Sequence, residues 1–257
     1  MRTVRTIAEL REALERARCG GSVGLVPTMG AYHDGHRALF PAAREECDVV
    51  VASLFVNPAQ FEESCDLDAY PRDLEADAAV AAEAAVDVLF APSADELYPP
   101  DFETWVEVAG LGRRLEGAHR PGHFRGVATV CLKLFNLVRP ERAYFGQKDA
   151  QQIAVLARMI RDLDLDLALR VVPTVRDSDG LALSSRNARL TPEERERALA
   201  LPRALATQDV EAARAELAGL DVDYVECVDL DPAVLAAAVR VGSTRLIDNV
   251  VLDKEKR

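Results

Sequence analysis

Residues 26–36 read VPTMGAYHDGH and continue directly from the short run SVGLV at 22–26. This order predicts a buried strand, a glycine turn at Gly30 and a helix that begins near Asp34. Such an arrangement forms an anion site, because glycine lets the backbone approach a phosphate and the first helical N–H groups point toward it. His33 and His36 are three residues apart and share one face of that helix. The stretch therefore predicts a phosphate-binding site on an α/β fold.

The two histidines suit phosphate chemistry, because imidazole donates a hydrogen bond in either protonation state and can pass on a proton in the transition state. Two other interpretations fit HDGH taken alone: a surface turn with incidental histidines, and a metal-binding pair at i and i+3. The preceding strand and the PTMG turn favour the phosphate-binding interpretation.

Outside this stretch, short runs rich in Val, Leu and Phe alternate with longer amphipathic or Ala-rich segments. This alternation is typical of βα units around a parallel sheet. We therefore expect an α/β fold with a doubly wound parallel sheet that binds ligands at the carboxyl ends of its strands. The expected strands are 22–26, 49–55, 86–90, 104–108, 143–145 and 167–172, and the expected helices are 37–46, 74–85, 127–138 and 150–163.

After Pro173 the sequence changes character. Residues 175–187, VRDSDGLALSSRN, are mostly polar, and TPEE at 191–194 opens a charged helix in the manner of a capping box. Two short strands are expected at 224–229 and 245–251. These segments predict a second, smaller α+β domain over residues 175–257, which follows a first domain over residues 1–174.

Composition excludes some classes of function. The 257-residue chain has 31 Lys and Arg against 43 Asp and Glu, a formal net charge of −12, so a general affinity for nucleic acid or anionic membrane is not expected. The five cysteines, at 19, 47, 65, 131 and 227, show no CxxC spacing and favour a reducing compartment. No signal peptide or long apolar span is evident. We expect a soluble, cytoplasmic protein.

Three loops next to predicted elements carry polar groups. SLFVNPAQF (53–61) presents Gln60 where a strand ends, either to a substrate or in an ordinary strand cap. EGAHRPGHFRG (116–126) is either an anion clamp or a solvated basic loop. YFGQKDAQQ (144–152) places Lys148, which suits a triphosphate, and Asp149, which suits ribose hydroxyls, at a helix start. Asp149 also fits a plain acidic residue of a first helical turn.

A fourth loop, LALSSRN (181–187), lies at the junction of the two predicted domains. Its two hydroxyls and its guanidinium can hold phosphate oxygens through several directed donors. Its place at the junction suits a closing lid, and the alternative is a turn without function.

Eight stretches occur together and in a fixed order. They are PTMGAYHDGH, SLFVNPAQF, YPRDLEAD, LFAPSADELYP, LEGAHRPGHFRGVATV, KLFNLVRPERAYFGQKDAQQ, DGLALSSRN and RVGSTRLIDN. Together they resemble the pantoate–β-alanine ligase family over most of the chain. The resemblance implies a Rossmann-like domain of the HxGH nucleotidyltransferase superfamily, a small C-terminal domain, a homodimer, and ATP with Mg²⁺. It implies condensation of pantoate with β-alanine to pantothenate through pantoyl adenylate, with release of AMP and pyrophosphate.

The resemblance also implies residue roles. His36 matches the catalytic proton donor, Gln60 and Gln152 match the pantoate ligands, with Gln60 also near β-alanine, and Asp77 is a candidate magnesium contact. Further groups suited to stabilising charge on the phosphates are His33, Lys148, Ser184, Ser185 and Arg186. The expected nucleotide contacts are Met29, Gly30, Ala31, Tyr32, His33, Asp34, Gly35, His36, Gly146, Gln147, Lys148, Asp149, Val175, Leu183, Ser184, Ser185 and Arg186.

A few positions depart from the family pattern. Tyr32 and Arg37 stand where aliphatic residues are common, Gln147 replaces a usual Glu, and Leu183 takes a frequent Met position. The C-terminal part is shorter than expected between about residues 202 and 240. None of these changes removes a presumed catalytic group.

Three rival functions remain to be compared. A relative of the class I aminoacyl-tRNA synthetases shares the HxGH motif and adenylate chemistry, but the chain has no basic RNA-binding extension. A cytidylyl- or adenylyltransferase leaves the nucleotide on its product, whereas free AMP is expected. A nucleotide sensor without catalysis is disfavoured because His36, Lys148 and the Ser-Ser-Arg segment are intact.

Overall fold

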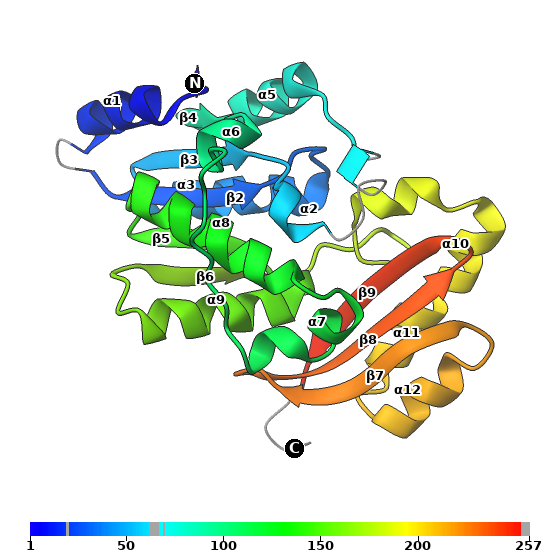
Figure 1. The fold of residues 1–257 in the computed structure, drawn as a ribbon. Coiled ribbons are helices and arrows are strands. Elements are labelled where there is room, and N and C mark those ends of the chain that lie inside the picture. Colours follow the sequence, from blue (N-terminus) through cyan, green and yellow to red (C-terminus); the bar gives the residue numbers. More distant parts are fainter. Residues whose placement is uncertain (19–20, 62–66, 69, 253–257) are drawn as a thin grey trace. The chain divides into compact units, whose positions relative to one another are not determined.

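The computed structural model describes residues 1–18, 21–61, 67–68 and 70–252, and the chain divides into two compact units (Figure 1). The first unit comprises residues 1–32, 36–145 and 155–172. The second unit comprises residues 33–35, 146–154 and the chain from Pro173 onward. Cys19 and Cys65 lie outside the described residues, and Cys47, Cys131 and Cys227 are free thiols.

A six-stranded sheet forms the centre of the first unit, in the order β1-β4-β3-β2-β5-β6. The chain runs from β2 outward through β3 and β4, then crosses to the other side of β2 for β5 and β6. The direction of winding therefore reverses between β2 and β5, which is the switch point where doubly wound sheets bind ligands at the carboxyl ends of the strands. The strands are β1 (Arg2–Val4), β2 (Val23–Thr28), β3 (Val49–Leu54), β4 (Val88–Phe90), β5 (Arg142–Gly146) and β6 (Ala168–Val172).

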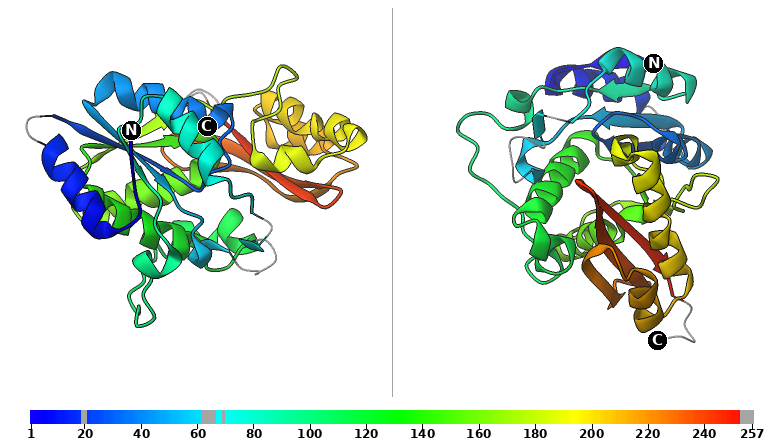
Figure 2. Two further views of the ribbon diagram at one scale, coloured as in Figure 1. Left: turned by 90° about the horizontal axis from the view of Figure 1, so that it is seen from above. Right: turned by 90° about the vertical axis from the view of Figure 1, so that its right-hand side faces the viewer.

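Helices cover both faces of this sheet (Figures 1 and 2). Because parallel crossovers are right-handed, the helices that serve the two winding directions lie on opposite faces. α3 and α5 cover one face, where Phe40 and Ala81 pack with Val26 and Leu89 of the strands. The helices of the unit are α1 (Ile7–Ala17), α3 (Leu39–Glu46), α5 (Leu74–Glu83), α6 (Ala94–Leu97), α7 (Glu116–His119), α8 (His123–Val138) and α9 (Ala150–Asp162), whose first turn belongs to the second unit.

The strand predicted at 104–108 is wrong. That segment contains no regular strand, and the place beside β4 is filled by β1, which pairs Arg2 with Val88. Two residues of this segment contact α8 instead: the backbone N–H of Val106 donates to Thr129 Oγ1 at 3.0 Å, and the Arg125 guanidinium lies 5.0 Å from the Trp105 ring centroid. The sequence analysis predicts neither β1 nor α1.

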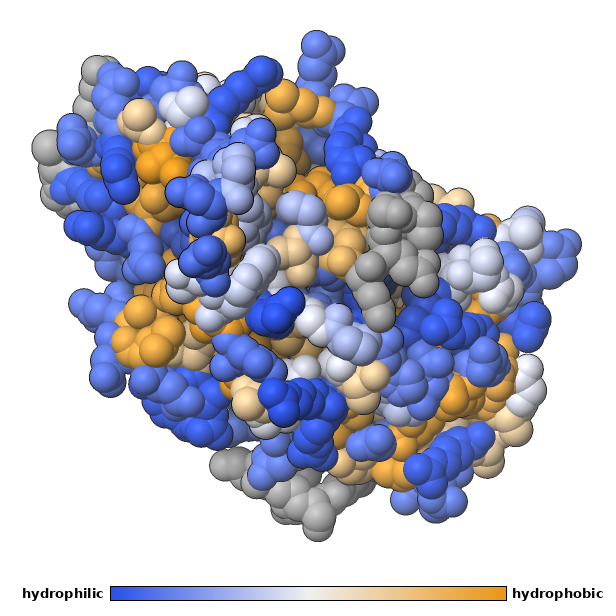
Figure 3. Space-filling model, in the orientation of Figure 1, coloured by the Kyte–Doolittle hydropathy of each residue, from blue (hydrophilic) through white to orange (hydrophobic). Residues whose placement is uncertain are grey.

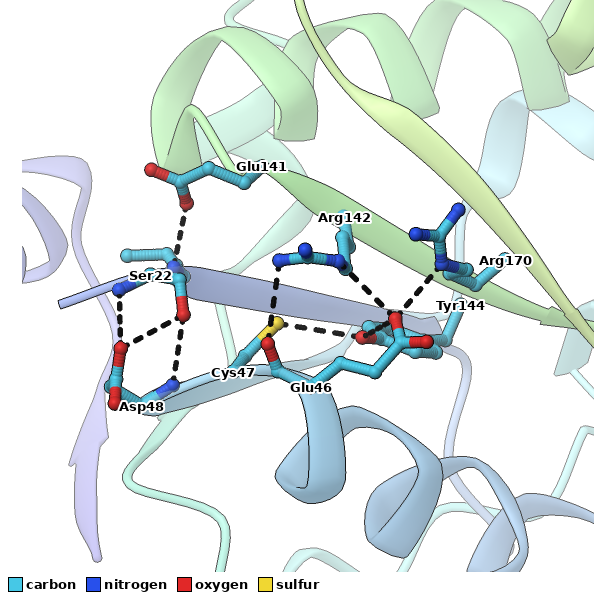
Figure 4. Close-up of polar contacts among 9 residues, drawn as sticks. Ser22, Glu46, Cys47, Asp48, Glu141, Arg142, Tyr144 and Arg170 are labelled. Atoms are coloured by element: carbon cyan, nitrogen blue, oxygen red, sulfur yellow. Dashed lines mark hydrogen bonds and ion pairs between the residues drawn. The ribbon is translucent and has the colours of Figure 1, made fainter.

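A polar network joins the amino ends of the parallel strands (Figure 4). Glu46, the last residue of α3, accepts hydrogen bonds from Tyr144 Oη at 3.0 Å and Arg170 Nε at 2.8 Å. Ser22 Oγ donates to Asp48 Oδ2 at 2.9 Å and links β2 to β3. The bond from Arg170 lowers the pKa of Glu46, and burial raises the pKa of Tyr144. This edge is therefore occupied by structural contacts, and the predicted site segments leave the opposite, carboxyl edge.

The second unit contains an antiparallel sheet in the order β7-β8-β9, as expected for a small α+β domain. Its strands are β7 (Asp221–Asp229), β8 (Ala233–Val241) and β9 (Thr244–Val251), so the strands predicted at 224–229 and 245–251 are confirmed. The helices are α2 (Asp34–Arg37), which begins in this unit, α10 (Pro192–Ala198), α11 (Ala200–Ala206) and α12 (Val210–Glu216). The predicted capping box of α10 is present at Thr191 and Glu194.

β8 is another strand that the sequence analysis misses. Its sequence, AVLAAAVRV, holds three consecutive alanines, which favour helices in isolation. The strand is central, pairs with β7 and β9, and buries every residue except Arg240. Leu235 and Val239 pack with Leu201 and Leu205 of α11 in the core of the unit. Burial on both faces therefore overrides the local preference of alanine.

Most of the face drawn in Figure 3 is hydrophilic, with smaller hydrophobic patches between the polar residues. This agrees with the 29% of charged residues in the chain. Among the described residues, no helix is both long enough and apolar enough to cross a membrane.

Candidate active site

The HDGH motif forms a tight turn at the start of α2, where the helix is predicted to begin. His33 Nδ1 accepts a hydrogen bond from the Gly35 N–H at 3.1 Å. A Cβ atom on Gly35 would lie 2.8 Å from His33 Cε1, so this contact requires glycine. Because Nδ1 accepts, the neutral ring carries its proton on Nε2. Burial and the positive charge of Lys148 lower the pKa of His33, which makes this ring a neutral hydrogen-bond donor at neutral pH.

His36 is supported by aromatic side chains of the first unit. Its ring centroid is 5.6 Å from that of Tyr32, and the Tyr32 ring packs edge-on against Phe40 at 5.3 Å. Thr28 Oγ1 donates to the Tyr32 hydroxyl at 3.1 Å, and burial raises the pKa of Tyr32 to about 12. Tyr32, which stands where aliphatic residues are common in the family that the chain resembles, therefore holds a fixed aromatic ring beside His36.

The turn after β2 is held by a buried carboxylate. Asp77 Oδ2 accepts from the Ala31 N–H and Oδ1 accepts from the Tyr32 N–H, both at 2.9 Å. Gly30 and Ala31 both have positive φ, +88° and +53°. A Cβ atom on Gly30 would lie 2.5 Å from Leu54 Cδ1, so only glycine fits. The side chain of Asp77 therefore fixes the backbone of Ala31 and Tyr32 in this turn.

Gln60 is fixed at the end of η1 (Pro58–Gln60), which follows β3. Its Nε2 donates to Met29 Sδ at 3.1 Å, and its Oε1 accepts from Asn57 Nδ2 at 3.1 Å. Asn57 is almost fully buried and also donates to the Gly126 carbonyl at 3.1 Å. His123 Nδ1 lies 2.9 Å from the Gln60 carbonyl oxygen. The basic loop around His123 therefore supports the segment that presents Gln60.

In the second unit, cationic and hydroxyl side chains share a pocket. Lys148 belongs to η3 (Gln147–Asp149), and Ser184 and Arg186 belong to the segment around η4 (Ser185–Arg189). The space along this pocket is about 270 Å³ when the adjoining open solvent is counted. Asn187 and Arg245 also line it, together with the apolar residues Leu181, Ala182, Leu201, Leu246 and Ile247. Arg245 Nε binds Asp223 at 2.5 Å, so its charge is already compensated. The arrangement suits an anion, because several donors and two further cations face one space.

A short hairpin leads into this pocket. The Leu183 N–H donates to the Val175 carbonyl at 3.0 Å, and Arg176 and Ala182 form a bridge next to them. Ser184 then caps η4, because its Oγ accepts from the Arg186 N–H at 3.3 Å. Val175 and Leu183 are both predicted nucleotide contacts, and this hydrogen bond makes them direct neighbours.

Comparison with known proteins covers nearly the whole chain. The family described as pantoate-beta-alanine ligase matches residues 2–251. Pantothenate synthetase 1 of Bradyrhizobium diazoefficiens is 51% identical over 278 residues, with 98% of each chain covered. Pantothenate synthetase of Corynebacterium efficiens is 52% identical over 284 residues, covering 98% of this chain and 99% of that protein. The chain belongs to the pantoate–β-alanine ligase family.

Solved structures of this family agree with the fold. Pantothenate synthetase from Thermus thermophilus superimposes with a TM-score of 0.92 at 48% identity, covering 98% of this chain and 99% of that one. Pantoate-β-alanine ligase from Francisella tularensis, a complex with β,γ-ATP and β-alanine, has a TM-score of 0.87 at 34% identity and covers 98% and 97% of the two chains. The predicted α/β class, a Rossmann-like sheet with a smaller α+β part, is confirmed. So is the predicted activity: this ligase forms pantothenate.

The predicted site residues of the ligase divide between the two units. The first unit holds Met29, Gly30, Ala31, Tyr32, His36, Gln60 and Asp77. The second unit holds His33, Asp34, Gly35, Gly146, Gln147, Lys148, Asp149, Gln152, Val175, Leu183, Ser184, Ser185 and Arg186. The structure brings Met29 to Gln60 within the first unit, and Lys148 to Ser184 and Arg186 within the second.

A protein-made metal site is not apparent in the described ranges, where no group of three or more His, Cys, Asp or Glu side chains is placed to hold an ion. Both carboxylate oxygens of Asp77 already accept backbone hydrogen bonds. Asp77 thus has a structural role in this turn, and the magnesium contact that the resemblance implies for it stays a prediction.

Several supporting residues escape the sequence analysis. Asn57 and His123 fix Gln60, and Asp248 and Asn249 lie buried in β9. The motif RVGSTRLIDN could have indicated the last two, because a charged residue and an amide residue that are buried in a strand need hydrogen-bond partners. Which partners they take depends on tertiary structure that no local pattern contains.

Proposed function

We propose that this ligase works through pantoyl adenylate, with ATP as the activating substrate and AMP and pyrophosphate as products. A carboxylate does not react directly with an amine, because oxide is a very poor leaving group. Transfer of AMP to the carboxylate creates a mixed anhydride whose leaving group is AMP. The two-step route therefore removes the main chemical barrier.

In the first step, a pantoate carboxylate oxygen attacks the α-phosphorus of ATP. The bond from that phosphorus to the oxygen bridging to the β-phosphorus breaks, and pyrophosphate leaves. In the second step, the β-alanine amine attacks the acyl carbon, the bond to the AMP oxygen breaks, and the nitrogen loses a proton. Pantothenate and AMP result.

The observation that carries this proposal is the pocket that Lys148, Ser184 and Arg186 share. Negative charge gathers on the phosphates as pyrophosphate leaves, and fixed donors in a partly enclosed site stabilise it. The lysine is a compact charge and the arginine supplies a planar set of donors, so the pair suits phosphate oxygens. We assign Ser185, Asp149 and the remaining predicted nucleotide contacts to the same bound ATP.

The two histidines have different proposed tasks. His33 is a neutral donor whose pKa is lowered by burial and by Lys148. His36 is the proposed proton donor to the phosphates, on its aromatic platform with Tyr32. We also propose residues 1–174 as the nucleotide- and pantoate-binding domain and residues 175–257 as the lid that shields the adenylate from water.

Gln60 and Gln152 are the proposed pantoate ligands. The support for Gln60 is its rigid mounting on Met29 and Asn57. A neutral amide orients the carboxylate through directed hydrogen bonds and leaves its charge available for attack. An arginine ion pair would instead stabilise that charge in the ground state.

Three further properties belong to the same proposal: a homodimer, Mg²⁺ bound with ATP, and a cytoplasmic location. Mg²⁺ usually keeps several waters and binds substrate phosphates, so it needs few protein ligands. When bound, the ion neutralises phosphate charge. Sedimentation velocity measures the oligomeric state, and titration of activity with Mg²⁺ measures the requirement.

Exchange of labelled pyrophosphate tests the adenylate route. With pantoate present and β-alanine absent, labelled pyrophosphate should appear in ATP. Addition of β-alanine should then give pantothenate, AMP and pyrophosphate. Formation of ADP and phosphate would overturn the proposal.

A further inference from the structure

The motif RVGSTRLIDN ends on two buried polar residues of β9 that no step of the proposed reaction uses. Asp248 is 3% exposed and Asn249 is 4% exposed. β9 pairs with β8 along its whole length, from Thr244 opposite Val241 to Val251 opposite Val234. The two side chains are therefore fixed to a rigid strand.

Asn249 binds the turn that carries Lys148. Its Nδ2 donates to the Gln147 carbonyl at 3.0 Å and to the Lys148 carbonyl at 2.8 Å. Its Oδ1 accepts from Gln147 Nε2 at 3.1 Å. One amide thus holds two consecutive carbonyls of η3 and is itself held in a single orientation.

Gln147 completes this arrangement, because its amide supplies a donor to Asn249 Oδ1. A carboxylate has no donor for Asn249 Oδ1 when ionised. With glutamine at 147, every polar group of the Asn249 side chain is bonded, which is what a buried amide requires.

Asp248, the residue before Asn249, holds the other segment that lines the pocket, the one that carries Ser184. Asp248 binds Arg176 through both carboxylate oxygens, at 2.6 and 3.2 Å. Arg176 also donates to the Gly180 carbonyl at 3.1 Å and pairs with Ala182 in the hairpin that leads to Ser184. Neighbouring residues of one strand thus hold both segments that line the pocket.

η3 is a single turn between the end of β5 and the start of α9. It is three residues long, and its lysine side chain is 18% exposed. A long side chain reaches a phosphate only as accurately as its backbone is placed, and displacement by about 1 Å can cost roughly 10²-fold in rate.

We infer that Asn249 is a positioning residue that sets the backbone of Lys148 for the phosphates of ATP. The inference rests on the proposed function of Lys148. Asn249 does not contact the substrate in this role, and its whole effect passes through the turn that it holds.

A double-mutant cycle on the full-length chain distinguishes this role from general stabilisation. The dissociation constant of α,β-methylene-ATP is measured by equilibrium dialysis for wild type, Asn249→Ala, Lys148→Ala and the double variant. Asn249→Ala should weaken binding roughly tenfold, within the coupling expected inside one hydrogen-bonded network. In the Lys148→Ala background, the same change should alter binding by less than about threefold, because the group that Asn249 positions is absent.

Two variants serve as controls. Thr244→Val is buried in the same strand, and Thr244 Oγ1 has no hydrogen-bond partner among the described residues, so binding should be unchanged. Asp209→Ala removes the N-cap of α12 and destabilises the same unit without touching η3. If Asn249→Ala does not fold, Asn249→Asp replaces it, since aspartate keeps the shape and the acceptor but loses both donors to the carbonyls.

Three results overturn parts of this account separately. Equal binding by wild type and the Asn249 variants would remove the positioning role. If the double variant loses affinity by the product of the two single losses, Asn249 has only a general structural role. The same holds if Asp209→Ala weakens binding as much as Asn249→Ala does. Unchanged binding by Lys148→Ala would contradict the proposed function of Lys148 itself.

Discussion

Asp77 offers a sharp test, because the resemblance and the structure give it different roles. As a magnesium ligand, it would control the response of activity to Mg²⁺. In the structure, Asp77 is buried, with 4% of its surface exposed, and it accepts hydrogen bonds from the Ala31 and Tyr32 N–H groups. We predict that Asp77→Asn lowers the free energy of unfolding and leaves the Mg²⁺ response unchanged.

The magnitude follows from the two bonds. Asparagine keeps one acceptor oxygen but places an NH₂ group against the other backbone N–H, so one bond to a charged group is lost, at about 1.5–3 kcal/mol. For a chain of this size each kcal/mol shifts the melting temperature by about 2–4 °C, so a fall of about 3–12 °C is expected. Asp77→Ala loses both bonds and should cost about 3–6 kcal/mol.

The assay combines urea unfolding with a Mg²⁺ titration of pyrophosphate exchange. Glu75→Gln is the matched control, because it makes the same charge change at an exposed residue of the same helix and should leave both measurements unchanged. A stable Asp77→Asn protein whose half-saturating Mg²⁺ concentration rises about tenfold or more would refute this reasoning and restore Asp77 as a metal ligand.

Three other predictions concern the proposed site. His36→Ala should lower the rate of adenylate formation by roughly 10²–10³, the loss expected for one preorganised donor, with the fold intact by circular dichroism; wild-type single-turnover rates would contradict its role. Gln60→Glu should impair pantoate-dependent exchange more than Gln60→Ala, because it adds like-charge repulsion to the loss of a donor, and both variants should bind ATP nearly normally; exchange at the wild-type rate in Gln60→Glu would show that the pantoate assignment is wrong. The pKa of His33 is lowered in the folded protein, so the unfolded chain binds a proton below about pH 6.5 and the folded chain binds it only at lower pH. The stability of the folded protein is therefore unaffected by this group above about pH 6.5 and decreases as the pH falls below it. Unfolding measured from about pH 7.5 to 5 should therefore lose more stability in wild type than in His33→Gln, and a steeper loss in the variant would contradict the shift.

Much of the sheet was predictable because its strands are buried and its turns use glycine. The apolar runs before Met29 and before Gly146 identify β2 and β5, and Gly30 marks a turn that only glycine can form. These features are local, so one sequence suffices to find them. The same reasoning places most of the candidate site at the carboxyl ends of the strands.

What escaped prediction depends on tertiary contacts. Residues 104–108 alternate as a strand does, yet they form no strand. β1, which was not predicted, pairs with β4. The alanines of β8 favour a helix until two neighbouring strands enclose them. The partner of Asp77 is a backbone turn 46 residues away in sequence, and no spacing rule connects the two.

Transfer of oxygen from pantoate to AMP tests the central claim most directly. Pantoate labelled with ¹⁸O in both carboxylate oxygens is incubated with ATP, Mg²⁺, β-alanine and the enzyme, and the products are analysed by mass spectrometry. An acyl adenylate requires that one labelled oxygen leave with AMP while the other stays in the amide of pantothenate. Label in inorganic phosphate, or AMP without label, would contradict the adenylate mechanism.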